Sequence, residues 1–116
     1  MKAIFKDLPK VSTNEIYAGK HWRARQKLKE SYLWLTCSEI KKMQPTSSKV
    51  DLDFTFHFKS RPLDSSITAY MAKLIEDCLV HYGILKNDDV KFVGKISLES
   101  KKSNQDLCEL EIKKFV

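Results

Sequence analysis

Apolar and polar residues alternate without a break from residue 50 to residue 58, inside a segment that we expect to form a strand over residues 49–59. The apolar positions are Val50, Leu52, Phe54, Phe56 and Phe58, and the polar ones are Asp51, Asp53, Thr55 and His57. Successive side chains of a strand point to opposite faces of its sheet, so this period of two predicts one core face and one polar face. A sheet built on such a strand needs a covering layer on one side only.

Two predicted helices are available as that layer. Residues 20–43 have a helical composition, and apolar residues recur there at roughly helical spacing: Trp22, Leu28, Tyr32, Leu35 and Ile40. We expect Trp22 to be a core anchor at the start of this helix. A second helix is predicted over residues 66–82, with an apolar stripe made of Ile67, Tyr70, Met71, Leu74, Cys78 and Leu79. Gly83 stands where a helix commonly ends.

The remaining apolar runs predict three further strands. Residues 2–6 form the first, and the other two contain the alternating sets Phe92, Ile96 and Leu98, and Cys108, Leu110 and Ile112. We expect residues 9–19 to be a polar loop. The predicted order is β-α-β-α-β-β, an α/β (α+β) fold in which a mixed sheet carries both helices on one face. We expect the 116 residues to form a single domain, 1–116.

Positive charge is concentrated near the beginning of the sequence. Lys and Arg number 21 against 15 Asp and Glu, and the first 30 residues contain eight basic and three acidic residues. This distribution favours a polyanionic partner over an acidic or neutral ligand.

Other features of the composition exclude several classes of protein. No apolar run approaches the ~20 residues of a membrane span, and the charged N-terminal residues do not read as a signal peptide. The three cysteines are odd in number and far apart, which suggests neither a disulfide framework nor a zinc cluster. We expect each cysteine to be a small buried residue, and the protein to reside in a reducing cytoplasm.

Carboxylates in two predicted loops are candidates for a metal site. Asp64 precedes the second helix, and Asp88 and Asp89 follow it. If the topology brings these loops together, their hard oxygen ligands would suit Mg²⁺, or Mn²⁺ in its place, and Lys73 would neutralise charge on a bound phosphate. The structural alternatives are a helix N-cap at Asp64, an ordinary turn at Asp88 and Asp89, and an i,i+4 ion pair between Lys73 and Asp77.

A basic segment opens the first long helix. Its members are Lys20, Arg23, Arg25, Lys27 and Lys29, and charges in this pattern suit contacts to the phosphates of a nucleic acid. The alternative is a solvated helix face without a partner.

Two segments of the chain resemble the RusA-type Holliday-junction resolvases, a family found mostly in bacteria and prophages. The first is Leu8-Pro9 followed by Ser12-Thr13-Asn14-Glu15-Ile16-Tyr17 and the basic stretch. The second runs from Asp64 through Lys73, Asp77 and the Gly83-Ile84-Leu85 segment to Asp88. The resemblance implies a cytoplasmic, bacterial or phage-encoded, dimeric and Mg²⁺-dependent endonuclease that nicks four-way DNA junctions.

Carried over residue by residue, the resemblance gives each candidate a role. Asp64, Lys73, Asp77 and Asp88 would be catalytic, and Asp64 and Asp88 would hold the metal ion with help from Asp89. The DNA contacts would come from Asn14, Lys20, Arg23, Arg25, Lys27, Lys29 and Arg61.

The chain departs from the family motif at two positions. In one register Ser66 and Ile67 stand where the motif has an Asp and an Asn; in a shifted register Asp64 is the second Asp and Pro62 replaces the first. Either way one expected carboxylate is missing, and the distance from the motif to the lysine is longer by about one helical turn. Two alternatives therefore stay open: a junction-binding protein with a degenerate metal site, and a small basic protein whose helix binds a protein partner.

Overall fold

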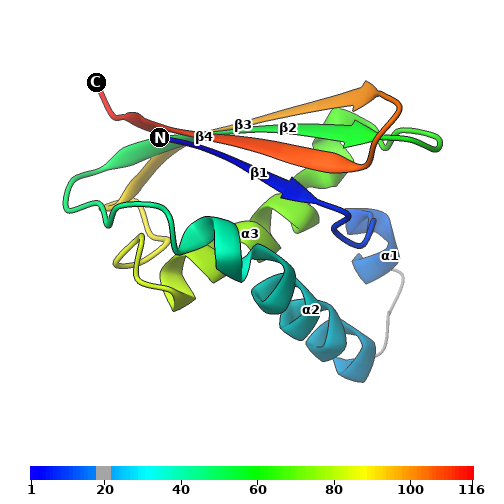
Figure 1. Ribbon diagram of the computed structural model, residues 1–116, viewed down its shortest axis with the longest axis horizontal. Coiled ribbons are helices and arrows are strands. Elements are labelled where there is room, and N and C mark those ends of the chain that lie inside the picture. Colours follow the sequence, from blue (N-terminus) through cyan, green and yellow to red (C-terminus); the bar gives the residue numbers. More distant parts are fainter. Residues whose placement is uncertain (18–21) are drawn as a thin grey trace.

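A four-stranded mixed sheet forms one layer of the molecule, and the helices form the other (Figure 1). The computed structural model describes residues 1–17 and 22–116. Its strands are β1 (Lys2–Lys6), β2 (Val50–Phe58), β3 (Val93–Lys102) and β4 (Leu107–Lys114). Its helical elements are α1 (Thr13–Tyr17), α2 (Trp22–Ile40), the 3-10 turn η1 (Ser65–Thr68) and α3 (Ala69–His81). The predicted α+β class and the order of strands and long helices are confirmed.

Strand β2 is the centre of the sheet, whose order is β1-β4-β2-β3. It pairs antiparallel with β4 and parallel with β3, so that Phe54 lies between Leu110 and Leu98. All five apolar side chains of β2 are buried and the four polar ones between them are half-buried, as the alternation predicts.

The helices cover the apolar face of the sheet (Figure 1). Helix α3 buries one stripe against it, and the members of that stripe are Met71, Ala72, Leu74, Ile75, Cys78 and Leu79. Helix α2 buries Tyr32, Thr36 and Ile40. Gly83 ends α3 with φ +81, a left-handed conformation that glycine adopts without strain.

The prediction of a polar loop over residues 9–19 is wrong for residues 13–17, which form α1. Ser12 and Glu15 make the reciprocal hydrogen bonds of a capping box: the Glu15 N–H donates to Ser12 Oγ at 3.1 Å, and the Ser12 N–H donates to a Glu15 carboxylate oxygen at 3.3 Å. The Ser-Thr-Asn-Glu sequence therefore starts a helix. Residues 18 and 19 of the predicted loop lie outside the described residues.

Two smaller expectations about burial are also wrong. The Trp22 side chain is 61% exposed and is not a core anchor. Cys37 is half-buried, whereas Cys78 and Cys108 are buried as predicted. Trp22 is the first residue of α2, and the Arg23 guanidinium lies over its ring at 5.6 Å.

Candidate functional site

Lys73 is the centre of a group of four charged residues on and after α3. Its ammonium forms ion pairs with Asp77 Oδ1 at 3.1 Å and Glu76 Oε1 at 3.4 Å, and it also pairs closely with the Asp88 carboxylate. Helix geometry places Lys73, Glu76 and Asp77 within one turn of α3. The loop that follows α3 brings Asp88 back to the same ammonium. We call these four residues the Lys73 cluster.

The electrostatics of the Lys73 cluster reflect these contacts. Partial burial lowers the pKa of Lys73, but the hydrogen bonds to Asp88 and Asp77 outweigh it, so the pKa is raised overall. The hydrogen bond from Lys73 lowers the pKa of Asp88. Burial raises the pKa of Glu76, and the nearby ammonium only partly opposes that shift. The cluster thus contains a protonated lysine, the carboxylates of Asp77 and Asp88 close to it, and the much more buried carboxylate of Glu76.

A groove between α2 and α3 lies beside the Lys73 cluster. It has a volume of about 430 Å³. Its lining residues come from the first two turns of α2 and from one face of α3, and are Trp22, Arg25, Gln26, Lys29, Tyr70, Lys73, Leu74 and Asp77. Three of these side chains are cationic and one is anionic, and two of the cations, Arg25 and Lys29, lie outside the Lys73 cluster. The structure thereby brings two predicted DNA contacts, Arg25 and Lys29, together with two predicted catalytic residues, Lys73 and Asp77.

The other predicted DNA contacts do not line this groove. Lys27 lies on the outer face of α2, where it lines a shallow hollow with Trp34, and Arg23 is exposed beside Trp22. Asn14 is exposed on α1, and Arg61 is exposed in the loop after β2, where its carbonyl accepts a hydrogen bond from Lys10. Lys20 lies outside the described residues.

The loops that carry Asp64 and Asp88 leave the β2–β3 pair at opposite ends. Ser65, next to Asp64, accepts a hydrogen bond from the N–H of Ser100, which pairs with the C-terminal part of β2. Asp88 instead precedes the start of β3. Asp64 makes no side-chain capping hydrogen bond to the 3-10 turn that follows it, so the helix-cap alternative is not confirmed for its side chain.

Asp89 takes part in a local turn, as the structural alternative predicted. Its carboxylate accepts hydrogen bonds from the Lys91 N–H at 3.0 Å and from Asn87 Nδ2 at 3.4 Å. Asn87 in turn accepts a hydrogen bond from the Asp88 N–H at 2.8 Å. These contacts fix the backbone at the position from which Asp88 reaches Lys73.

The oxygen donors near Lys73 have the chemistry that Mg²⁺ prefers. Within residues 1–17 and 22–116, no group of three or more His, Cys, Asp or Glu side chains is arranged so that it could already hold a metal ion. One or two carboxylates are enough for Mg²⁺ when phosphate and water complete its coordination, so the residues present fit the ion in that mode.

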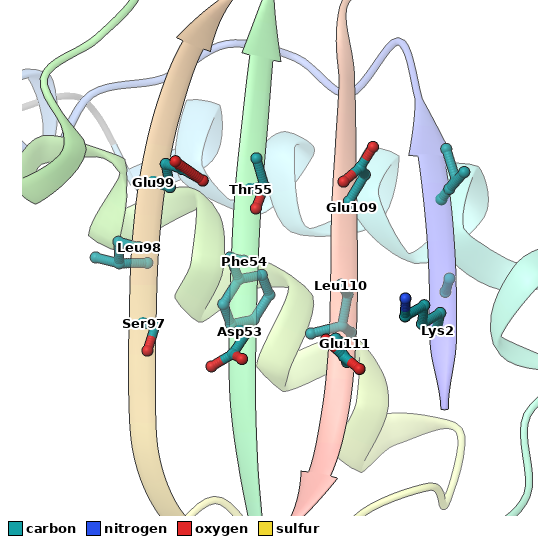
Figure 2. Close-up of a pocket in the computed structure, with 12 residues that line it drawn as sticks. Lys2, Asp53, Phe54, Thr55, Ser97, Leu98, Glu99, Glu109, Leu110 and Glu111 are labelled. Carbon is teal, nitrogen blue, oxygen red and sulfur yellow. The ribbon is translucent and has the colours of Figure 1, made fainter.

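The opposite face of the molecule is acidic at its centre. Figure 2 shows Asp53, Glu99, Glu109 and Glu111 projecting from the uncovered face of the sheet, with the helices behind it. These carboxylates line a hollow of about 480 Å³ that contains one lysine, Lys2. The neighbouring Lys113 forms an ion pair with Asp53 at 2.8 Å, and this hydrogen bond lowers the pKa of Asp53. The carboxylates at the centre of the sheet face and the cations of the groove thus lie on opposite faces of the molecule.

Sequence reasoning missed two members of the site, Glu76 and Tyr70. Glu76 stands three residues after Lys73, a spacing that predicts a contact in a helix, but its burial depends on tertiary packing. Tyr70 belongs to the predicted apolar stripe of α3 and also lines the groove.

Comparison with known proteins adds no assignment. No protein-family model matches the chain, and no curated protein matches it significantly. Among the described residues, no helix is long and apolar enough to cross a membrane.

Proposed function

We propose that the protein is a structure-specific DNA endonuclease of the RusA type, which hydrolyses phosphodiester bonds in four-way junctions with Mg²⁺, or with Mn²⁺ in its place. The observation that carries this proposal is the groove between α2 and α3, where Arg25 and Lys29 lie beside Lys73 and Asp77. Nuclease chemistry needs phosphate-binding cations next to carboxylates, and this groove supplies both.

In the proposed complex, the groove binds the DNA backbone through its cationic side chains. Arg25 and Lys29 neutralise phosphate charge, and the Lys73 ammonium donates a hydrogen bond to an oxygen of the phosphate that is cut. When bound, Mg²⁺ supplies an activated water and neutralises charge on the leaving oxygen. Asp88 is the metal-binding carboxylate closest to Lys73, and Asp64 and Asp89 remain predicted ligands. Symmetric cutting of a junction needs two sites, so we propose a homodimer.

The second candidate is a junction-binding protein that does not cut. The observation that favours it is the ion pair between Lys73 and Asp88, which occupies both predicted catalytic groups, while Asp64 lies at the other end of the β2–β3 pair. This candidate uses the same groove and the same cationic residues.

One assay distinguishes the two candidate functions. The protein is incubated with a labelled four-way junction and with a linear duplex, each in Mg²⁺ and in Mn²⁺. The endonuclease proposal expects nicks in the junction that need the divalent ion and are lost in Asp88→Asn. Salt-sensitive junction binding without nicks would support the second candidate, and the absence of binding at low salt would reject both.

A further inference from the structure

The Lys73 cluster has more negative charge than its lysine neutralises. Three carboxylates, from Glu76, Asp77 and Asp88, contact a single ammonium. With all groups ionised, the cluster has an excess of two negative charges at the edge of an otherwise cationic groove. Carboxylates held this close repel one another unless a further cation, or a proton, lies among them.

Of the three carboxylates, that of Glu76 is the most buried, so its negative charge is the most costly to leave without a partner. The residue is only 5% exposed, and its Oε2 atom is buried without a hydrogen-bond partner. Oε1 contacts the Lys73 ammonium at 3.4 Å, so one oxygen of this carboxylate belongs to the cluster. A buried carboxylate oxygen without a partner is costly, and such an atom is a sign of a ligand that is bound there in the functional state.

We infer that Glu76 and Asp88 form a divalent-cation site, and that the Lys73 ammonium holds the position of the cation until the ion binds. The inference deepens the proposed function, on which it rests for the role of the ion in phosphate chemistry. Two carboxylates that contact the same ammonium provide hard oxygen ligands for Mg²⁺ or Mn²⁺, and water or a DNA phosphate completes the coordination. Asp77 adds negative charge next to the ion.

Displacement of the Lys73 side chain opens a path for the ion into the site and frees the ammonium for another contact. The Lys73 side chain is 48% exposed, so it is free to swing outward as the ion enters toward the buried Glu76 oxygen. Lys73 also lines the groove with Arg25 and Lys29. Binding of the ion therefore releases an ammonium into the groove, where it adds a third cation for the phosphate. The ion and the DNA would then bind with positive cooperativity.

The test measures Mn²⁺ binding to the full chain without DNA, by electron paramagnetic resonance. We expect one saturable Mn²⁺ site per chain. Glu76→Gln and Asp88→Asn should each weaken binding by at least about tenfold. Lys73→Met should strengthen binding because it removes the competing ammonium. Glu111→Gln, a matched change on the opposite face of the sheet, should leave binding unchanged, and thermal melts should show that each variant is folded.

Three results would overturn the inference: no saturable Mn²⁺ site, wild-type affinity in Glu76→Gln, or weaker binding in Lys73→Met. Asp64→Asn separates this site from the one predicted by the family resemblance. Loss of Mn²⁺ in Asp64→Asn with retention in Glu76→Gln would place the ion at Asp64 and reject the present site. Mn²⁺ binding without junction nicking would retain the cation site and reject only the nuclease.

Discussion

The Tyr32 side chain joins α2 to a segment 23 residues earlier in the chain by one hydrogen bond. Its ring is fully buried in α2, and its hydroxyl donates a hydrogen bond to the Pro9 carbonyl at 2.6 Å. Burial raises the pKa of Tyr32, which favours the protonated hydroxyl that donates this hydrogen bond. The contact fixes α2 against the segment between β1 and α1.

We expect Tyr32→Phe to lower the free energy of unfolding by about 1–2 kcal/mol, because the half-buried Pro9 carbonyl loses its hydrogen-bond donor. Chemical denaturation measures the change. Trp34→Phe is the matched control, since Trp34 lies on the same helix but is 79% exposed, and its effect should be within about 0.5 kcal/mol. Equal losses in both variants would contradict the role assigned to the hydroxyl.

Among the elements, strand β2 shows how directly a period of two determines structure. Phe54 and Thr55 are adjacent, yet Phe54 is 1% exposed and stacks on Phe56 with ring centroids 6.0 Å apart, while Thr55 lies on the open face. The prediction for β2 was accurate because successive residues of a strand point to opposite faces. The five apolar residues stand at every second position, so all of them lie on the same face of the sheet.

Phe54→Ala should lower the free energy of unfolding by about 3–5 kcal/mol, because it leaves a cavity between the sheet and the helices. Thr55→Ala should cost less than about 1 kcal/mol, since it changes only strand propensity on the exposed face. Denaturant titration of the two variants checks the contrast. Similar losses at both positions would contradict the one-sided core.

Helix boundaries and faces were less predictable than β2. The apolar spacing in residues 20–43 indicated a helix. It could not show that the Trp22 side chain is exposed, because the burial of that position depends on how α3 packs beside it. The helix α1 was missed although Ser12 and Glu15 carry a recognisable capping box, since five residues provide too little periodicity to predict a helix. The basic segment likewise divides into Arg25 and Lys29 in the groove, and Lys27 on the outer face.

At the scale of the whole molecule, two layers separate two kinds of charge. The helical layer carries a groove with three cationic side chains, whereas the open sheet face carries four carboxylates around its central hollow. The basic excess of the first 30 residues and the acidic residues on both sides of α3 could be read directly from the sequence. The sequence could not show that Asp88, rather than Asp64, reaches Lys73, because that choice depends on which end of the sheet each loop leaves.

The central claim of this account is that DNA binds at the groove between α2 and α3. The most direct test measures the affinity of a fluorescent four-way junction by anisotropy, without divalent ions, over a series of salt concentrations. The variants are Arg25→Glu with Lys29→Glu in the groove, and Lys2→Glu with Lys6→Glu on the open sheet face, which change the net charge equally.

The account predicts that the groove pair weakens binding by at least about tenfold at moderate salt and lowers the slope of log affinity against log salt by about two. The sheet-face pair should change affinity by less than about threefold, because the remaining effect is long-range and screened by salt. Equal weakening by both pairs, or wild-type affinity in the groove pair, would contradict the assignment of the groove to DNA.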